Sequence, residues 1–106
     1  MDKKIDPYMI LKIAGMDIEV FLVPGDGESF GDFTYIQGQI RIDSRLKKGA
    51  LVDTLLHEVL HAIWAVGHLK SRREKEERAV SVTATTLTQI FRDNPHFMKW
   101  ITKNLV

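Results

Sequence analysis

A chain of 106 residues with 44% hydrophobic residues and a formal net charge of +1 has apolar material for one modest core and too little for a second. Its near-neutral charge excludes the excess of lysine and arginine that nucleic-acid binding requires. The lack of cysteine excludes disulfides and thiolate metal ligands and fits a reducing compartment. No apolar run follows the lysines near Met1, and no stretch reaches about 18 apolar residues, so we expect a cytoplasmic protein without a membrane-spanning segment.

The first quarter of the chain predicts a β-hairpin. Tyr8–Ile13 and Asp17–Val23 are rich in isoleucine, valine, leucine and phenylalanine, and Ala14–Met16 between them is typical of a turn. Pro24–Gly27 then ends the pattern. We interpret this segment as a turn and not as a calcium loop, because the ligand spacing of such a loop is missing.

A second pair of strands is predicted at Phe33–Ile36 and Gln39–Asp43. In the latter, Ile40 and Ile42 alternate with polar residues, which indicates one face on the core and one in water. We therefore expect a small, mostly antiparallel sheet, with Gln39–Asp43 at an exposed edge. A protein or peptide substrate could add there as an extra strand. The alternative is an edge strand that binds nothing.

The apolar run Ala50–Val66 predicts a helix with one polar stripe, formed by Asp53, Thr54, His57, Glu58 and His61. His57 and His61 are one turn apart, about 6 Å along the axis, so both imidazoles could bind one metal ion. Glu58 would then lie beside the metal, where a carboxylate can accept a proton from water. Because apolar residues surround the stripe, we expect the imidazoles to lie in a mostly dry environment. The alternative is a pair of hydrogen-bonded core histidines with Glu58 exposed.

The third ligand is predicted on a second helix. Ser71–Glu74 has the pattern of a capping box, and Gly67 is a plausible end for the first helix, so a helix from Arg72 to about Arg92 would run antiparallel to it. From His61 to its end, the first helix rises about 8 Å, and the second helix covers about 8 Å in the opposite direction between Arg72 and Glu77. Glu76 and Glu77 therefore return to the level of the histidines.

Glu77 is favoured over Glu76 as the ligand, because an apolar stripe continues from position 77 through Val80, Ala84, Leu87 and Phe91. The alternative is a solvated charged turn. His68 would lie about 10 Å beyond His61 along the first helix, too far for a shared metal, and His96 is expected at a surface or helix start. After Asp93, Asn94 and Pro95 predict a third helix, whose stripe of Phe97, Trp100, Ile101 and Leu105 would pack on the core.

This arrangement resembles the small gluzincin-type zinc metallopeptidases, on the strength of the HExxH helix, the short turn and Glu77 followed by Val80 and Ala84. It is most similar to short metallopeptidases that phages and prophages encode, and more distantly to ImmA/IrrE-type and SprT-type peptidase domains. The similarity is specific over His57–Ala84 and looser over Ile40–Pro95. It implies an α+β, minimal zincin-like domain over residues 1–106, in a bacterial or phage-infected cell.

The resemblance also implies zinc held by His57, His61 and Glu77, with Glu58 as the general base of a metalloendopeptidase. Asp53, four residues before His57, is the candidate for orienting that imidazole from behind. The sequence does not identify a side chain that stabilises the oxyanion. Two alternatives remain: a non-catalytic zinc-binding structural or regulatory module derived from a peptidase, and a metal-free helical interaction protein.

Overall fold

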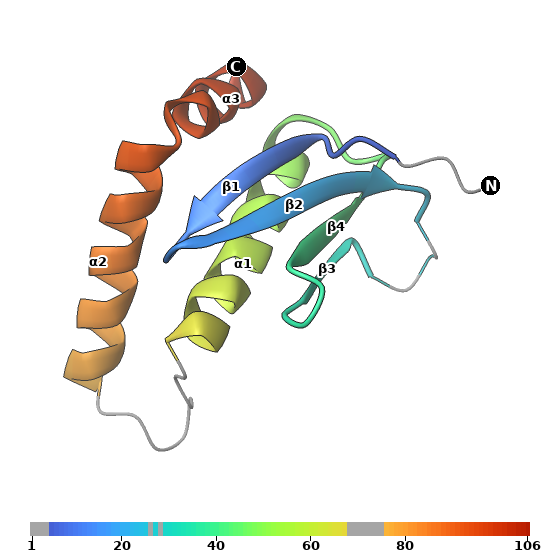
Figure 1. Cartoon of the computed structure of the whole chain (residues 1–106). Helices are drawn as coiled ribbons and strands as arrows, with labels where there is room; N and C mark the ends of the chain where they lie inside the picture. The colour runs from blue at the N-terminus through green and yellow to red at the C-terminus, as the bar shows by residue number, and fades with distance from the viewer. Residues whose placement is uncertain (1–4, 26, 28, 68–75) are drawn as a thin grey trace.

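The computed structural model describes residues 5–25, 27, 29–67 and 76–106. It has two layers, a four-stranded sheet and a layer of helices on one of its faces (Figure 1). This confirms the expected α+β class. The elements, in chain order, are β1 (Met9–Ile13), β2 (Met16–Val23), β3 (Gly31–Thr34), β4 (Gln39–Asp43), α1 (Lys48–Val66), α2 (Glu76–Asp93) and α3 (Pro95–Leu105).

The predicted β1–β2 hairpin is present, and the second pair of predicted strands also forms a hairpin. β1 and β2 pair antiparallel around a two-residue turn, in which Ala14 and Gly15 both have positive φ, +50° and +83°. Such a turn matches the twist of the strands it joins. The β3–β4 hairpin closes through Gly38, at φ +62°, whose N–H donates to the carbonyl of Tyr35. β3 begins at Gly31, two residues before the predicted start.

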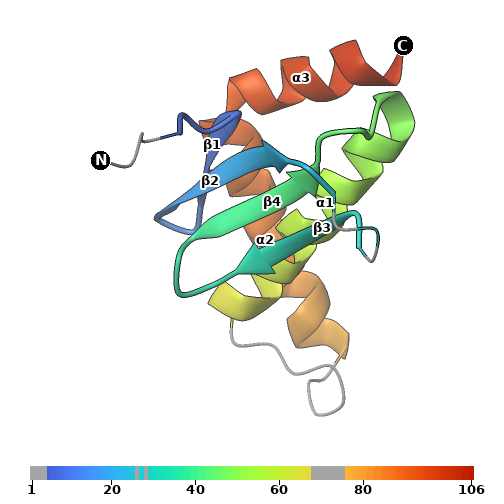
Figure 2. The same ribbon diagram turned by 90° about the vertical axis from the view of Figure 1, so that its right-hand side faces the viewer.

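The order of the strands differs from the expectation. The sheet runs β1-β2-β4-β3, with β4 parallel to β2 and antiparallel to β3 (Figure 2). The prediction of a mostly antiparallel sheet is therefore wrong, because the sheet is mixed. Gln39–Asp43 is not an edge strand either: it lies between two strands, where Ile40 and Ile42 are fully buried. The edges are β1 and β3.

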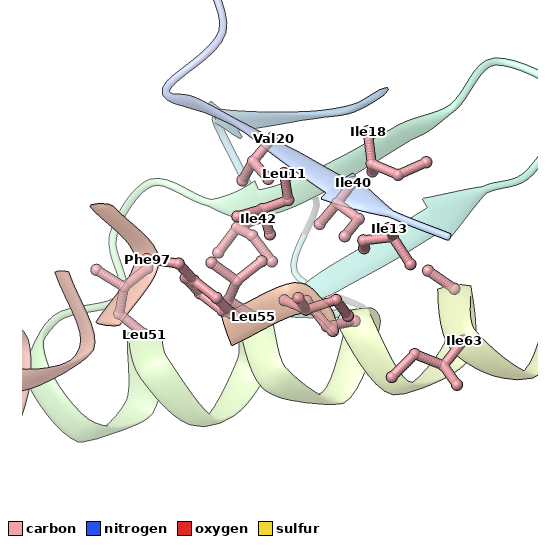
Figure 3. Close-up of a cluster of buried hydrophobic side chains, with 13 residues drawn as sticks. Leu11, Ile13, Ile18, Val20, Ile40, Ile42, Leu51, Leu55, Ile63 and Phe97 are labelled. Carbon is pink, nitrogen blue, oxygen red and sulfur yellow. The ribbon is translucent and has the colours of Figure 1, made fainter. Parts of the chain in front are cut away.

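The core lies between the sheet and α1. Side chains from the inner face of the strands meet one face of α1, and Phe97 of α3 closes one end of the cluster (Figure 3). α1 has the length and apolar composition of a membrane-spanning helix, but core helices of globular proteins pass the same test. Seven of its side chains are buried, and it contacts β3, β4, α2 and α3. α1 is therefore the central helix of this fold.

The predicted boundaries of the helices are confirmed where the structure describes them. α1 ends at Val66, and the N–H of Gly67 donates to the carbonyl of Ile63. The capping box at Ser71–Glu74 lies outside the described residues. α2 turns inward a face that shares only Leu87 with the predicted stripe: Val80, Ala84 and Phe91 are exposed, whereas Val82 and Leu87 are partly buried and Ile90 is fully buried. The sequence of α2 has the expected helical period, but packing against the sheet determines which side of the helix is buried.

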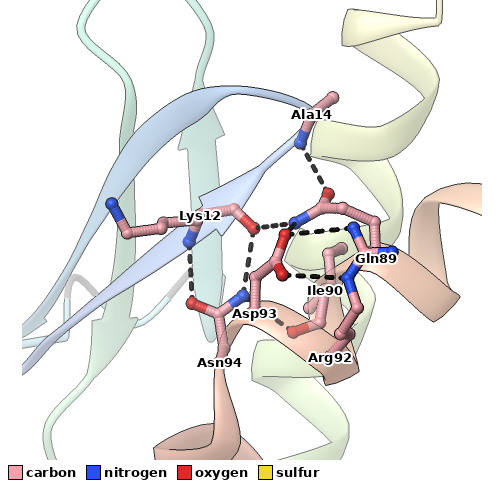
Figure 4. Close-up of polar contacts among 7 residues, drawn as sticks. All are labelled: Lys12, Ala14, Gln89, Ile90, Arg92, Asp93 and Asn94. Atoms are coloured by element: carbon pink, nitrogen blue, oxygen red, sulfur yellow. Dashed lines mark hydrogen bonds and ion pairs between the residues drawn. The ribbon is translucent and has the colours of Figure 1, made fainter.

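Side chains from the α2–α3 corner cover the outer edge of β1 (Figure 4). Asn94 accepts a hydrogen bond from the N–H of Lys12 and donates to the carbonyls of Lys12 and Ile90. Gln89 accepts from the N–H of Ala14 and also donates to the Lys12 carbonyl. His96 donates to the carbonyl of Ile10. Asn94 stands at the predicted N-cap of α3, but its side chain bonds β1 instead of the helix.

α3 packs back on the core as expected. Phe97 is fully buried, and its ring stacks on Trp100 with the centroids 6.0 Å apart. The Trp100 indole N–H donates to the Tyr8 hydroxyl over 2.6 Å, which ties α3 to the start of β1. Leu105, at the end of the predicted stripe, is exposed.

Candidate active site

α1 presents the three residues of the HExxH motif toward β3. A spacing of four residues turns a helix by about one full turn, so His57 and His61 lie one above the other. Their Nε2 atoms are 3.1 Å apart, and the ring centroids are separated by 4.8 Å. Both rings therefore turn the same nitrogen toward one point in space.

This separation fits a shared metal. Two imidazole nitrogens bound to one tetrahedral zinc, each at 2.0–2.1 Å, lie about 3.3 Å apart. The observed 3.1 Å is close to that value. The same distance also fits a hydrogen bond between two neutral imidazoles, in which one Nε2–H donates to the other ring. The two interpretations differ in protonation, because metal binding needs both Nε2 lone pairs directed at the ion.

The two histidines of the motif are more exposed than expected. His57 and His61 are exposed, whereas Glu58 is only 5% exposed. The Glu58 carboxylate makes no hydrogen bond or ion pair with another described residue. Burial raises its pKa; the neighbouring His61 and His57 oppose this effect, and the Asp32 carboxylate adds to it. The helix thus holds a desolvated carboxylate beside two accessible imidazoles.

The third ligand cannot be placed from the described residues. Among them, no group of three His, Cys, Asp or Glu side chains is close enough to hold a metal ion. Glu76 and Glu77 form the start of α2, but their side chains lie outside the described part of the structure, as does His68. His96 lies elsewhere, at the β1 edge. The described residues therefore supply two of the three predicted ligands, and the assignment of Glu77 stays a prediction.

Asp53 lies one turn before His57, and its side chain is exposed. No hydrogen bond joins it to His57, whose described polar contact is with His61. Its predicted role in orienting the imidazole therefore has no support in the hydrogen bonding. Asp53 instead lines a hollow that it shares with His57 and Glu58.

A groove with two hollows separates α1 from β3. The larger hollow, about 520 Å³, lies beside His61 and is also lined by Phe33, Tyr35 and Ala65. The smaller, about 290 Å³, lies toward the start of α1 and is lined by Phe30, Asp53 and Thr54, among others. Gly31, His57 and Glu58 line both. The motif therefore sits at the midpoint of one continuous depression.

Gly31 lines both hollows where β3 approaches α1 closely, and sequence reasoning missed it. A Cβ there would lie 3.0 Å from Thr54 Cγ2 and from Ile42 Cδ1. Glycine thus lets β3 approach α1 while leaving the space above Glu58 open. A glycine at the start of a strand that faces a helix is the signal that could have indicated this close approach.

The groove is bordered by an edge of the sheet that is not covered. Phe30 and Asp43 are joined by a backbone hydrogen bond, so the alternation of an antiparallel ladder directs Asp32 and Thr34 toward β4. By the same alternation, Gly31 and Phe33 direct their N–H and C=O groups away from the sheet. No described side chain bonds them, in contrast to the groups on β1.

Comparison of the chain with protein-family models, with curated proteins and with solved structures finds no match.

Proposed function

We propose that this protein is a zinc-dependent peptidase whose centre is His57, Glu58 and His61. The observation that carries the proposal is the pair of Nε2 atoms 3.1 Å apart beside Glu58, a residue that is 5% exposed, lines the groove and has no described partner. Glu77 is the proposed third ligand, with Glu76 as the alternative.

The residues divide the work of amide hydrolysis. Zinc, when bound, lowers the pKa of a water molecule and polarises a carbonyl group. Glu58 accepts a proton from the attacking water and later delivers it to the leaving amine nitrogen. Its position in the floor of the groove, between the two hollows, suits a group that acts on a bond crossing them. Tyr35, in the wall beside His61, offers a phenol O–H as the proposed donor to the carbonyl oxygen.

The proposed substrate is an extended peptide lying along β3. The outward N–H and C=O groups of Gly31 and Phe33 can pair with a peptide backbone as one more strand would. This replaces the earlier expectation of binding at Gln39–Asp43, which is internal. A peptide bound in this way would cross the groove over Glu58, which lines both hollows. The cysteine-free composition supports a cytoplasmic site of action.

Metal content measured on purified protein tests the proposal first. We expect one zinc per chain in the wild type and in Glu58→Gln, and loss of zinc in His57→Ala and Glu77→Ala. His96→Ala is the matched control, because that imidazole lies at the β1 edge and should leave the zinc content unchanged. A wild type that holds no zinc after zinc is added would overturn the proposal.

Cleavage of a peptide library separates a peptidase from a non-catalytic zinc module. We expect wild-type protein to cleave extended peptides and Glu58→Gln to cleave them about 10²- to 10⁴-fold more slowly, as is typical for loss of a general base. Tyr35→Phe should lower the turnover number with little effect on zinc. Zinc bound without any cleavage would favour the structural module.

A further inference from the structure

We propose that the smaller hollow of the groove binds a basic side chain of the peptide substrate, lysine or arginine, through Asp53 and Phe30. This inference rests on the proposed function, because it assigns a specificity to the same groove. It concerns the end of the groove toward the start of α1, where Ser29, Phe30, Gly31, Asp53, Thr54, His57 and Glu58 form the wall.

The charge of this hollow is negative. Asp53 and Glu58 both line it, and no lysine or arginine is among its described lining residues. Nearby cations are already held by other carboxylates: Arg41 binds Asp32 over 3.0 Å, and Arg45 binds Asp43 over 2.7 Å. Asp53, by contrast, forms no hydrogen bond or ion pair with another described residue. A cation supplied by a substrate would therefore meet an acceptor that no described side chain neutralises.

The shape of the hollow also suits a long basic side chain. Phe30 is 63% exposed, directly precedes β3 and lines the hollow together with Asp53. An exposed aromatic ring can cover the methylene stem of lysine or arginine and attract its charged head by a cation–π interaction. The carboxylate on α1 and the ring on the β3 side would hold the two ends of one side chain.

The burial of Glu58 adds to the evidence that this hollow receives a ligand. Glu58 is only 5% exposed as a residue, has no described partner, and lines the same hollow. The hollow is thus lined by the carboxylate that we propose to act on the substrate.

Helix and strand spacings give the position of the selected residue. Asp53 precedes Glu58 by five residues, about 7.5 Å along the axis of α1. An extended peptide covers that distance in about two residues. We expect the basic residue about two positions from the cleaved bond, on the side that lies toward the start of α1.

Binding of synthetic peptides to the Glu58→Gln protein tests the inference without cleavage. The probes are labelled nine-residue peptides of alanine and threonine, with one lysine, glutamine or glutamate two positions from the centre on either side. We expect the best lysine peptide to bind about fivefold more tightly than its glutamate counterpart, as measured by fluorescence anisotropy. Asp53→Asn should reduce that ratio to near one, and Asp53→Lys should reverse it.

Asp17→Asn is the matched control, because it removes an exposed carboxylate from the other end of the sheet. It should leave the lysine preference unchanged. Asp53→Asn should also keep its zinc content, which distinguishes substrate binding from a role in orienting His57. Equal binding of the three peptides, binding of none, or a lysine preference that survives Asp53→Asn would overturn the inference.

The experiments distinguish failure of this inference from failure of the proposed function. Zinc-dependent cleavage without a preference for basic residues would leave the peptidase standing and remove the inference. An Asp53-dependent preference for lysine peptides in a protein that holds no zinc would do the opposite.

Discussion

Glu58 combines burial with the lack of a described partner, so it lowers the stability of the fold that carries it. At neutral pH, the ionised carboxylate is desolvated and its pKa is raised. We predict that Glu58→Gln raises the thermal unfolding midpoint of the metal-free protein at pH 7, because the substitution removes the buried charge. Circular dichroism in the presence of a chelator measures the difference.

The stabilisation of Glu58→Gln relative to the wild type should become smaller as the pH falls. A carboxyl group with a raised pKa in the folded state becomes neutral at a higher pH than the same group in the unfolded state. Glu19→Gln, on the sheet, is the control for removing one negative charge. A Glu58→Gln protein less stable than the wild type would mean that the carboxylate has a partner in solution.

Asp43 shows the opposite balance at a buried carboxylate. It is 3% exposed and accepts hydrogen bonds from the backbone and guanidinium of Arg45, which lower its pKa from 3.8 to about 2. Because the folded pKa is depressed, the stabilisation is fully present above about pH 4 and is lost as the pH falls toward 2. We predict a falling urea midpoint over that interval.

Arg45→Met should flatten this dependence, since it removes the partner while keeping the aliphatic stem. A pH profile that is the same in wild type and Arg45→Met would contradict the assignment.

The spacing of His57, Glu58 and His61 could be predicted from the sequence, since it depends only on the period of a helix. Their burial could not. Which side of α1 becomes wet depends on how the helix is rotated under β3, and Gly31, 26 positions before His57, sets how closely the two elements approach. The sequence predicted imidazoles in the dry interior, whereas in the structure both are exposed and only Glu58 is largely buried.

At the scale of elements, the close approach of β3 to α1 should be sensitive to one methyl group. Gly31→Ala places a Cβ 3.0 Å from Thr54 Cγ2 and from Ile42 Cδ1, so these side chains or β3 itself must shift. We predict a loss of about 1 kcal/mol in unfolding free energy and a severalfold loss of peptide affinity. Denaturant titration and anisotropy measure the two effects.

Gly49→Ala is the matched control for the added methyl, because its Cβ would meet no atom within 4 Å and alanine favours the helix. It should leave peptide binding unchanged and stabilise the protein slightly. Equal effects of the two substitutions would show that the width of the groove does not matter.

The covered edge of β1 depends chiefly on Asn94, whose fully buried side chain makes three hydrogen bonds. Asn94→Ala leaves the N–H of Lys12 without a partner. We predict a loss of about 2 kcal/mol in unfolding free energy, in the range for buried groups left unsatisfied. Urea unfolding measures it.

Gln89→Ala serves for comparison, because Gln89 bonds the same edge in a more exposed position. Its cost should be smaller. If the two substitutions cost the same, burial does not determine the strength of this edge.

The hairpins could be predicted because their signals are local: apolar runs joined by short turns. The order of the strands could not, because the placement of β4 beside β2 depends on pairing between residues about 20 positions apart. The edge expected at Gln39–Asp43 therefore belongs to β3, whose four residues include a glycine and an aspartate and give a weak strand signal. The buried face of α2 could not be predicted for the same reason, because the residues it packs against lie in β1 and α1, far away in the sequence.

At the scale of the whole molecule, a metal that joins α1 to the start of α2 would link these two helices at one end of the helical layer. Ligands that bind only the folded state add to its stability, by about 2.7 kcal/mol at a free concentration 100 times the dissociation constant. We predict that zinc raises the unfolding midpoint by roughly 10 °C or more. Differential scanning calorimetry measures the shift.

His57→Ala should show no such shift, and magnesium should not replace zinc, because it prefers oxygen ligands. A zinc effect of equal size in His57→Ala would place the metal elsewhere.

The cover over β1 has a consequence for the way the chain is made. Lys12 and the Asn94 side chain that bonds it are 82 positions apart, so a ribosome releases β1 long before its cover. Until the α2–α3 corner has emerged, both edge strands of the nascent sheet, β1 and β3, are uncovered, and each can pair with a strand of another chain. A stalled or truncated translation product that ends before Asn94 would therefore expose the β1 edge and tend to aggregate through it, although the complete protein covers this edge.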